Sequence, residues 1–308
     1  MKTTSLGLKI VALITLVNAS MAPGFDKVEP RGLYASYETV SDYYAGRGER
    51  ELASLESSSL KEYLNQVLNS GHIRREGAAD ELVESCPEDS HTYKRGESCQ
   101  KVRFLSYDEA RRYLFGHVYL REDKHDHFFI EPLYCARRYE KGIGPMKIPN
   151  TSVTGLNTEH VFPKSHFKSS RSKHRAPEMK TDIHHLAPSV AHVNSFRGSF
   201  HFGEPSTSID SVDGCEESIR GRHKSSGGRI LFSPRDSRKG DVARMMMYFS
   251  VRFNVGIADY EEKALRRWHE QDPVSERERK LNDLKFSVQG NRNPFIDYPS
   301  LVKRISNF

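Results

Sequence analysis

Three side chains with complementary chemistry occur in two short stretches of this sequence. Glu159 offers a hard carboxylate oxygen, the kind of ligand that Mg²⁺ and Ca²⁺ prefer, and Asn194, 35 positions further on, offers a neutral amide oxygen. His160 carries an imidazole with an ordinary pKa of about 6.5, so it can accept a proton from water near neutral pH. These residue types predict metal-assisted hydrolysis, in which His160 is the general base and one divalent ion keeps several positions for water and phosphate.

The adjacency of Glu159 and His160 raises a geometric question, because neighbouring residues on a regular strand point to opposite faces. One answer is an irregular backbone at this point, with Pro163 helping to end the strand. The other is that the two side chains reach one phosphate from different directions. The sequence leaves both answers open.

The elements that position these residues begin in the middle of the chain, where the spacing of apolar residues changes from helical to strand-like. Residues 127–135 are rich in aromatic and branched side chains, which favours a strand, and Pro132 indicates an edge or a bulge. A second strand is expected to end near Glu159. Residues 142–150, which include two prolines, form the turn-rich connection between the two strands.

Helical spacing of apolar residues predicts the scaffold around the site. Gly71 supplies a stop after the first helix, Ser106 opens the second with a start that resembles a capping box, and Ser275 caps the last. The three consecutive methionines at 245–247 are expected to fill the core rather than to bind a ligand. The predicted helices cover residues 60–68, a segment from 106, and residues 239–255, 260–270 and 275–288.

The chain has 308 residues with 36% hydrophobic and 10% aromatic content, which is enough to bury a sizeable core and excludes global disorder. Its first 19 residues combine two lysines with an apolar stretch at 10–17 and a small-residue end, which is typical of a secretory signal peptide cut after Ala19. Residues 20–55 are expected to form an N-terminal arm with short helical turns, and residues 56–308 one catalytic domain. No other stretch approaches the roughly 20 apolar residues of a membrane span.

The chain is basic, and the position of the charge is more informative than its amount. The formal charge of +6 falls by two, to +4, without the signal peptide, which holds two lysines and no acidic residue. One basic cluster lies between the two halves of the predicted site, where a polyanion bound through its phosphates needs positive charge. An ordinary solvated basic surface is the alternative reading of both clusters. The first cluster comprises Lys164, Lys168, Arg171, Lys173, Arg175 and Lys180, and the second Arg220, Arg222, Lys224, Arg229, Arg235, Arg238 and Lys239.

The four cysteines form an even set in a chain with a signal peptide, which favours disulfide bonds. Three pairings are possible, and the sequence does not choose among them. In one of them Cys86 pairs with Cys99 across a polar excursion, and Cys135 pairs with Cys215 across distant parts of the core. A zinc site is the alternative, but it needs close pairs such as C-x-x-C, which the sequence lacks.

The residues around the predicted site belong to a longer series of motifs in fixed order, which is far more specific than a two-residue motif. The series begins with Asn157-x-Glu159-His160-x-x-Pro163-x-Ser165, Thr181-Asp182-Ile183-His184-His185-Leu186-x-Pro188-Ser189 and Val193-Asn194-Ser195-x-Arg197-Gly198-x-x-x-Phe202-Gly203-Glu204. It continues with Lys239-Gly240-Asp241-Val242-Ala243-Arg244, Trp268-His269-x-x-Asp272-Pro273-Val274 and Gln289-Gly290-Asn291-Arg292-Asn293-Pro294-Phe295. In these motifs the chain resembles the bacterial endonuclease I family, secreted or periplasmic nucleases of the ββα-metal (His-Me finger) superfamily, from about Leu60 to the C-terminus.

The resemblance implies an α+β fold, mainly helical, in which two strands and a helix that starts near Ser189 form a ββα-metal core. It implies a nonspecific endonuclease that cuts DNA, and often RNA, with one divalent metal and leaves 5′-phosphate ends. Carried over by motif, His160 is the general base, and Glu159 and Asn194 hold the metal. Mg²⁺ is the expected ion, with Ca²⁺ and Mn²⁺ as alternatives. We expect a monomer, secreted or periplasmic, with no membrane association after signal removal.

The chain departs from the family pattern in three places. The first is the cysteine-bearing insertion at 71–105, and the second is the segment 199–202, Ser-Phe-His-Phe, where relatives commonly place Asn and Pro before the last Phe. The third concerns the phosphate-clamping arginine that the family implies near the site, for which Arg171 and Arg175 are both candidates. None of these departures affects the base or the two metal ligands, so we expect them to affect substrate grip and regulation.

Two other functions are alternatives to hydrolysis with one metal ion. A secreted nucleic-acid-binding module without catalytic activity is the first, but such a protein is expected to have lost the base or a ligand. A zinc hydrolase that uses His184 and His185 is the second, but adjacent histidines seldom bind one ion together and no H-E-x-x-H run is present. Asp182 and His184 are instead expected to support the site without direct action. No recognition-helix or zinc-finger pattern predicts base specificity.

Overall fold

A computed structural model describes residues 34–86, 96–169, 173–224 and 227–308. The predicted signal peptide and Arg171 lie outside these residues. The described part is mixed α and β with more helix than strand, as the sequence predicts. No helix in this part has both the length and the apolar character that a bilayer span requires.

Helix α8 (Lys239–Phe253) lies at the centre of the helical core, and nearly all of its residues are buried. It packs against α3 (Ser57–Asn69), α9 (Asp259–Gln271) and α11 (Pro294–Asp297). The three methionines at 245–247 are buried in this core, as predicted. The predicted helices are confirmed, because α3, α8, α9 and α10 (Glu276–Gln289) cover the expected segments.

Two of the predicted capping residues mark the positions where helices begin. Ser106 caps α4 (Tyr107–Tyr113) and Ser275 caps α10, and each forms a full capping box with the glutamate three residues later. The arm contains the short helices α1 (Val40–Tyr43) and α2 (Glu49–Ala53). The remaining short turns are a π-helix at Leu114–Val118 and 3₁₀ helices at Lys164–Ser169, Lys173–Arg175, Asp236–Arg238 and Pro299–Arg304.

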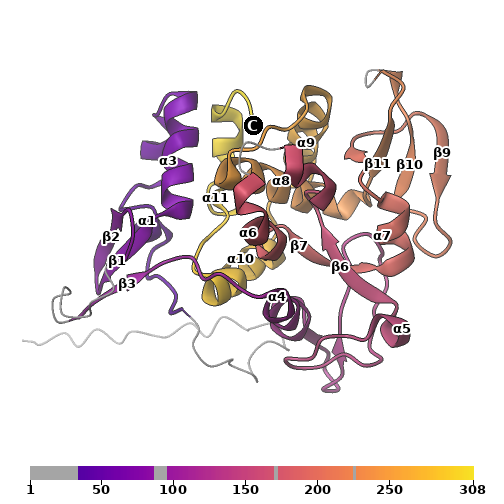
Figure 1. Cartoon of the computed structure of the whole chain (residues 1–308), viewed down its shortest axis with the longest axis horizontal. Coiled ribbons are helices and arrows are strands. Elements are labelled where there is room, and N and C mark those ends of the chain that lie inside the picture. The colour runs from indigo at the N-terminus through magenta and orange to yellow at the C-terminus, as the bar shows by residue number, and fades with distance from the viewer. Residues whose placement is uncertain (1–33, 87–95, 170–172, 225–226) are drawn as a thin grey trace, which may run out of the picture.

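Two small sheets lie at opposite ends of the molecule, with most helices between them (Figure 1). The first is antiparallel, in the order β2 (Ala78–Val83), β1 (Gly71–Arg75), β3 (Glu97–Gln100), and is formed by the cysteine-bearing insertion. The second has the order β8 (His201–Phe202), β11 (Ile230–Ser233), β10 (Ile219–Arg222), β9 (Thr207–Ser211), with β8 parallel to β11. Disulfides join Cys86 to Cys99 and Cys135 to Cys215, one of the three pairings open at the sequence level.

The predicted site residues lie on an antiparallel strand pair and the helix that follows it. Strand β6 (Leu156–His160) pairs with β7 (Leu186–Val190) in unbroken register, so that Glu159 lies opposite Ala187 and His160 opposite Leu186. Helix α7 (Ala191–Arg197) follows β7 directly, and α6 (Ala176–Thr181) precedes it. Gly155, between α5 (Thr151–Thr154) and β6, has φ +71°, a left-handed conformation that a glycine adopts without strain.

Two details differ from the sequence-based expectation. The strand expected through Cys135 is limited to β5 (Phe128–Phe129), which pairs with β4 (Arg121–Glu122) and not with β6. Pro132 has no N–H to donate to a strand ladder. The next residue, Leu133, donates its N–H to the carbonyl of Pro188 in β7. Ser189 does not cap α7 either, because it lies inside β7 and Val190 holds the N-cap position without a side-chain cap.

Candidate active site

Glu159, His160 and Asn194 line one pocket of about 460 Å³, which we call the site pocket. Strand β6 supplies the first two residues, and α7 supplies the third. The unbroken register of β6 with β7 excludes a bulge at Glu159 and His160. The two neighbours therefore approach the pocket from different directions, which is the second of the two arrangements left open by the sequence.

Glu159 is a buried carboxylate held by two neighbours. The Tyr134 hydroxyl donates to Oε1 at 2.7 Å, and Nη1 of Arg197 lies 3.4 Å from the same oxygen. Burial raises the pKa of Glu159, while the positive charge of Arg197 and the Tyr134 hydrogen bond act in the opposite direction. No side chain in the described ranges donates to Oε2, so this oxygen can serve a cation in the pocket.

Asn194 is oriented by hydrogen bonds to strand β6. Its Nδ2 donates to Oδ1 of Asn157 at 2.8 Å and to the carbonyl of Thr158 at 3.2 Å. Both hydrogens of the amide nitrogen therefore have acceptors, which fixes the orientation of the side chain and directs its oxygen away from these two acceptors. The Oδ1 atom accepts no hydrogen bond from the residues that the structure describes, and it adds a second hard oxygen to the pocket.

His160 is held in the tautomer that a general base requires. Its Nε2 lies 3.0 Å from the carbonyl of Lys180, and a carbonyl only accepts, so the proton of the neutral ring resides on Nε2. The lone pair is then on Nδ1, which has no hydrogen-bond partner in the described part of the chain. Burial lowers the pKa of His160 to about 3, with His185 adding to the shift, and the ring is neutral at physiological pH.

Arg197 also lines the site pocket, although the sequence motif that contains it indicated no role for it. Its guanidinium is buried, donates to the carbonyl of Val161 at 2.8 Å, and lies 4.6 Å from the ring centroid of Phe202. It follows Asn194 by three residues on α7, and this spacing brings two side chains to one helix face. That spacing was the available signal for its place beside Glu159.

Two further cationic residues, Arg111 and Lys164, line the site pocket. Arg111 comes from α4, and its one ion pair among the described residues is a 3.9 Å contact with the largely exposed Asp108. Arg175, by contrast, lines a different pocket and holds Glu178 at 2.6 Å. The structure therefore places Arg175 outside the site pocket, while Arg171 lies outside the described residues.

Asp182 and the two histidines that follow it are internal supports. Asp182 accepts hydrogen bonds from Tyr248 at 2.9 Å and from Arg252, and the ring Nε2 atoms of His184 and His185 face the carbonyls of Asn291 and Met179. Among the described residues no three His, Cys, Asp or Glu side chains gather as a metal site. The oxygen donors of the site pocket, one carboxylate and one amide, suit a hard divalent cation that keeps most of its water.

Comparisons with known proteins place this chain in a family. Residues 123–300 match the family model of Endonuclease I. The chain is similar to an extracellular ribonuclease of Bacillus subtilis (38% identity over 50% of this chain and 55% of the relative) and to an endonuclease-1 of Buchnera aphidicola (25%, over 47% and 60%). It is also similar to an extracellular deoxyribonuclease of Aeromonas hydrophila (27%, over 39% and 50%). The chain thus spans between half and two thirds of the length of these relatives. Because the family model covers more than half of its residues, the chain belongs to the endonuclease I family.

Proposed function

We propose that this protein is a secreted, nonspecific endonuclease that hydrolyses phosphodiester bonds of DNA, and of RNA, with one divalent metal ion. The observation that carries the proposal is the site pocket itself. It combines Nδ1 of neutral His160, which no described residue contacts by a hydrogen bond, with two oriented oxygen donors, from Glu159 and Asn194. Family membership supports phosphodiester hydrolysis as the reaction.

The chain's own residues divide the work of hydrolysis between them. His160 accepts a proton at Nδ1 from the water that attacks phosphorus, and general-base assistance of this kind contributes roughly 10² to 10⁴ in rate. The Lys180 carbonyl keeps the opposite ring nitrogen protonated throughout. When bound, the metal supplies Lewis-acid stabilisation of the developing phosphate charge and of the departing 3′-oxygen. Because the bond between phosphorus and the 3′-oxygen breaks, the phosphate stays on the 5′ end of the product.

Glu159 and Asn194 are the residues that would hold the metal. Their two oxygens fit Mg²⁺, which prefers few protein ligands and retains waters and substrate phosphates, while Ca²⁺ and Mn²⁺ are alternatives. The succession β6, β7, α7, which presents a base from a strand and a ligand from the following helix, supports the ββα-metal type of core. We assign residues 56–308 to one catalytic domain, and we expect a monomer.

Relatives named as a ribonuclease and as a deoxyribonuclease support both nucleic acids as substrates. Both of these relatives are named as extracellular, and together with the two disulfides this supports export from the reducing cytoplasm. Arg111 and Lys164 supply positive charge inside the pocket, which suits phosphate contacts without base readout. We propose Arg111 as the arginine that grips a phosphate there.

The decisive experiment is nicking of supercoiled plasmid by the oxidised protein in Mg²⁺. We expect EDTA to abolish nicking and His160→Ala to slow it by about 10² to 10⁴-fold, with DNA binding retained. His125→Ala is the matched control, because His125 is an exposed histidine in a turn and does not line the site pocket. Plasmid that is bound but never cut in any divalent ion would replace the enzyme with a nucleic-acid-binding module.

A further inference from the structure

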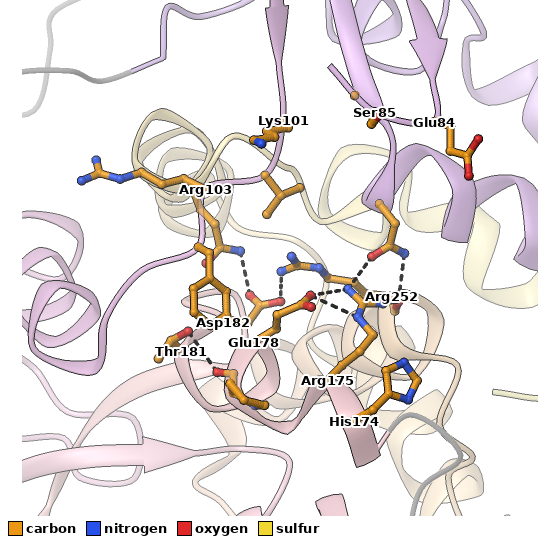
Figure 2. Close-up of a pocket in the computed structure, with 16 residues that line it drawn as sticks. Glu84, Ser85, Lys101, Arg103, His174, Arg175, Glu178, Thr181, Asp182 and Arg252 are labelled. Carbon is orange, nitrogen blue, oxygen red and sulfur yellow. Dashed lines mark hydrogen bonds and ion pairs between the residues drawn. The ribbon is translucent and has the colours of Figure 1, made fainter. Parts of the chain in front are cut away.

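A second pocket, of about 450 Å³, lies between α6 and the start of the segment that leads into α4 (Figure 2). Pro177 and Thr181 of α6 line it. Lys180, adjacent to Thr181, contacts two residues that line the site pocket: its carbonyl accepts from His160, and its ammonium lies 4.7 Å from the ring centroid of Tyr107. Helix α6 therefore lines the second pocket and contacts the lining of the site pocket.

Residues 101–111, which we call the 101–111 strip, extend along both pockets. Lys101, Arg103 and Phe104 line the second pocket, whereas Tyr107 and Arg111 line the site pocket. Phe104 and Tyr107 are three positions apart, so their Cα atoms are separated by at most about 11 Å. A bound chain molecule can therefore contact both pockets along this strip.

The backbone of the strip is fixed at several points. The Tyr34 hydroxyl donates to the carbonyl of Lys101 at 2.8 Å, and the Arg103 N–H donates to the carbonyl of Gln289 at 2.7 Å. Strand β3, which leads into the strip, is tied to Cys86 through the disulfide at Cys99. The strip therefore presents its side chains from a fixed backbone, which lowers the entropy cost of binding a ligand.

Phe104 is the most unusual residue of the strip. Its side chain is 59% exposed, and the other large exposed hydrophobics in the described ranges, Val153 and Ile209, are aliphatic. An exposed aromatic ring beside cationic side chains matches the arrangement with which proteins bind unpaired nucleic acid, because every base has a face that can stack. Lys101 and Arg103 lie on the N-terminal side of Phe104, and Arg111 lies beyond it.

The ionisable lining of the second pocket comprises Lys101, Arg103, Arg175, Arg252, His174, Glu84, Glu178 and Asp182. All three arginines of this lining are in ion pairs: Arg252 with Asp182, Arg175 with Glu178, and Arg103 with Glu109 of the strip. Among the described residues Lys101 has no ion-pair partner, and Figure 2 shows it in the upper part of the view, near Arg103. Lys101 is therefore the cation that the strip offers to a phosphate on this side of Phe104.

We propose that the 101–111 strip binds a single-stranded segment of the substrate, with one base stacked on Phe104 while a neighbouring phosphate lies in the site pocket. In a duplex, the base faces are covered by adjacent base pairs, so stacking on Phe104 requires an unpaired base. The inference rests on the proposed function, because it places the reacting phosphate of the same strand beside His160. Single-stranded DNA and RNA satisfy it equally.

The test measures binding of fluorescent single-stranded DNA, single-stranded RNA and blunt duplex DNA to the full oxidised protein carrying His160→Ala, which prevents cleavage. Addition of Phe104→Ala should weaken single-strand binding by about five-fold to 100-fold, and Phe104→Trp should restore it. Blunt duplex binding should change less than two-fold, because duplex bases do not reach the ring. Equal loss on all three ligands, or no loss on the single strands, would overturn the proposal.

Ile209→Ala is the matched control, since Ile209 is comparably exposed, at 55%, on β9. Its binding constants should equal those of the parent. The thermal midpoint of Phe104→Ala should also equal the parent's, because the side chain is largely in solvent. If the protein cuts plasmid normally and Phe104→Ala leaves single-strand binding unchanged, this inference alone is wrong. If the protein cuts no plasmid, yet Phe104→Ala weakens single-strand binding, the proposed function alone is wrong.

Discussion

At the scale of single residues, the site is defined by atoms that the protein has left available. Nδ1 of His160 and the amide oxygen of Asn194 lack hydrogen-bond partners among the described residues, whereas the opposite atom of each group is firmly committed. This one-sided bonding presents a lone pair from each side chain without the cost of reorientation when a ligand arrives. The same criterion separates Arg111 from the other arginines, because Arg197 and Arg175 are bound internally.

Arg111 should therefore be the phosphate contact of the site pocket. We expect Arg111→Ala to weaken binding of all DNA sequences alike and to reduce the slope of log affinity against log salt by about one. The plasmid-nicking KM should rise accordingly. Arg112→Ala on the same helix is the control, because Arg112 is exposed and does not line the site pocket. An unchanged salt slope in Arg111→Ala would show that another cation holds the phosphate.

At the scale of elements, the last turn of α6 and the segment that joins it to β7 decide how His160 is held. The last turn carries the Lys180 carbonyl that orients His160, and Asp182 anchors the segment that follows it. The Asp182 carboxylate accepts from the His184 N–H at 2.9 Å and from Gln289 at 3.0 Å, in addition to its pairing with Arg252. One buried carboxylate thus ties the segment to α8 and α10, and this matches the supporting role expected for Asp182.

Loss of this anchor should be costly. Asp182→Ala leaves Arg252 buried without its partner, and we expect the free energy of unfolding to fall by about 3 to 5 kcal/mol in urea titrations. Asp210→Ala is the contrasting control, because the Asp210 pair with Arg220 is largely exposed, and it should cost no more than about 1 kcal/mol. Equal effects of the two substitutions would contradict the assignment of Asp182 as the anchor.

The elements also show what could and could not be predicted from the sequence. Helices were predictable because their signals are local: Ser106 and Ser275 cap the helices that they were expected to cap. Strand partners were not predictable, since pairing depends on distant residues, and β6 pairs with β7 rather than with the earlier β5. The grouping of Glu159, His160 and Asn194 followed from motifs, whereas the position of Arg111, which comes from a separate helix, carried no sequence signal.

At the scale of the whole molecule, the core depends on uncharged histidines. Burial lowers the pKa of His184 to about 3 and that of His185 to about 4, well below the ordinary value of about 6.5 in an unfolded chain. The ring of His184 is bound to the Asn291 carbonyl near the end of α10, at 2.8 Å. Protonation of such a ring requires a charge inside the core, so the folded state resists it.

Acid should therefore unfold the protein in a defined pH window. Below pH 6.5 the unfolded chain binds a proton at His184 that the folded chain does not, so stability is full above this pH and falls as the pH decreases toward the folded-state pKa of about 3. Each such histidine contributes a slope of about 1.4 kcal/mol per pH unit. In urea titrations between pH 6.5 and 4, the free energy of unfolding should depend less steeply on pH in His184→Gln than in the parent, by about 1.4 kcal/mol per pH unit. His125→Gln, an exposed control, should retain the full slope, and equal slopes for all three proteins would show that His184 is already charged in the folded state.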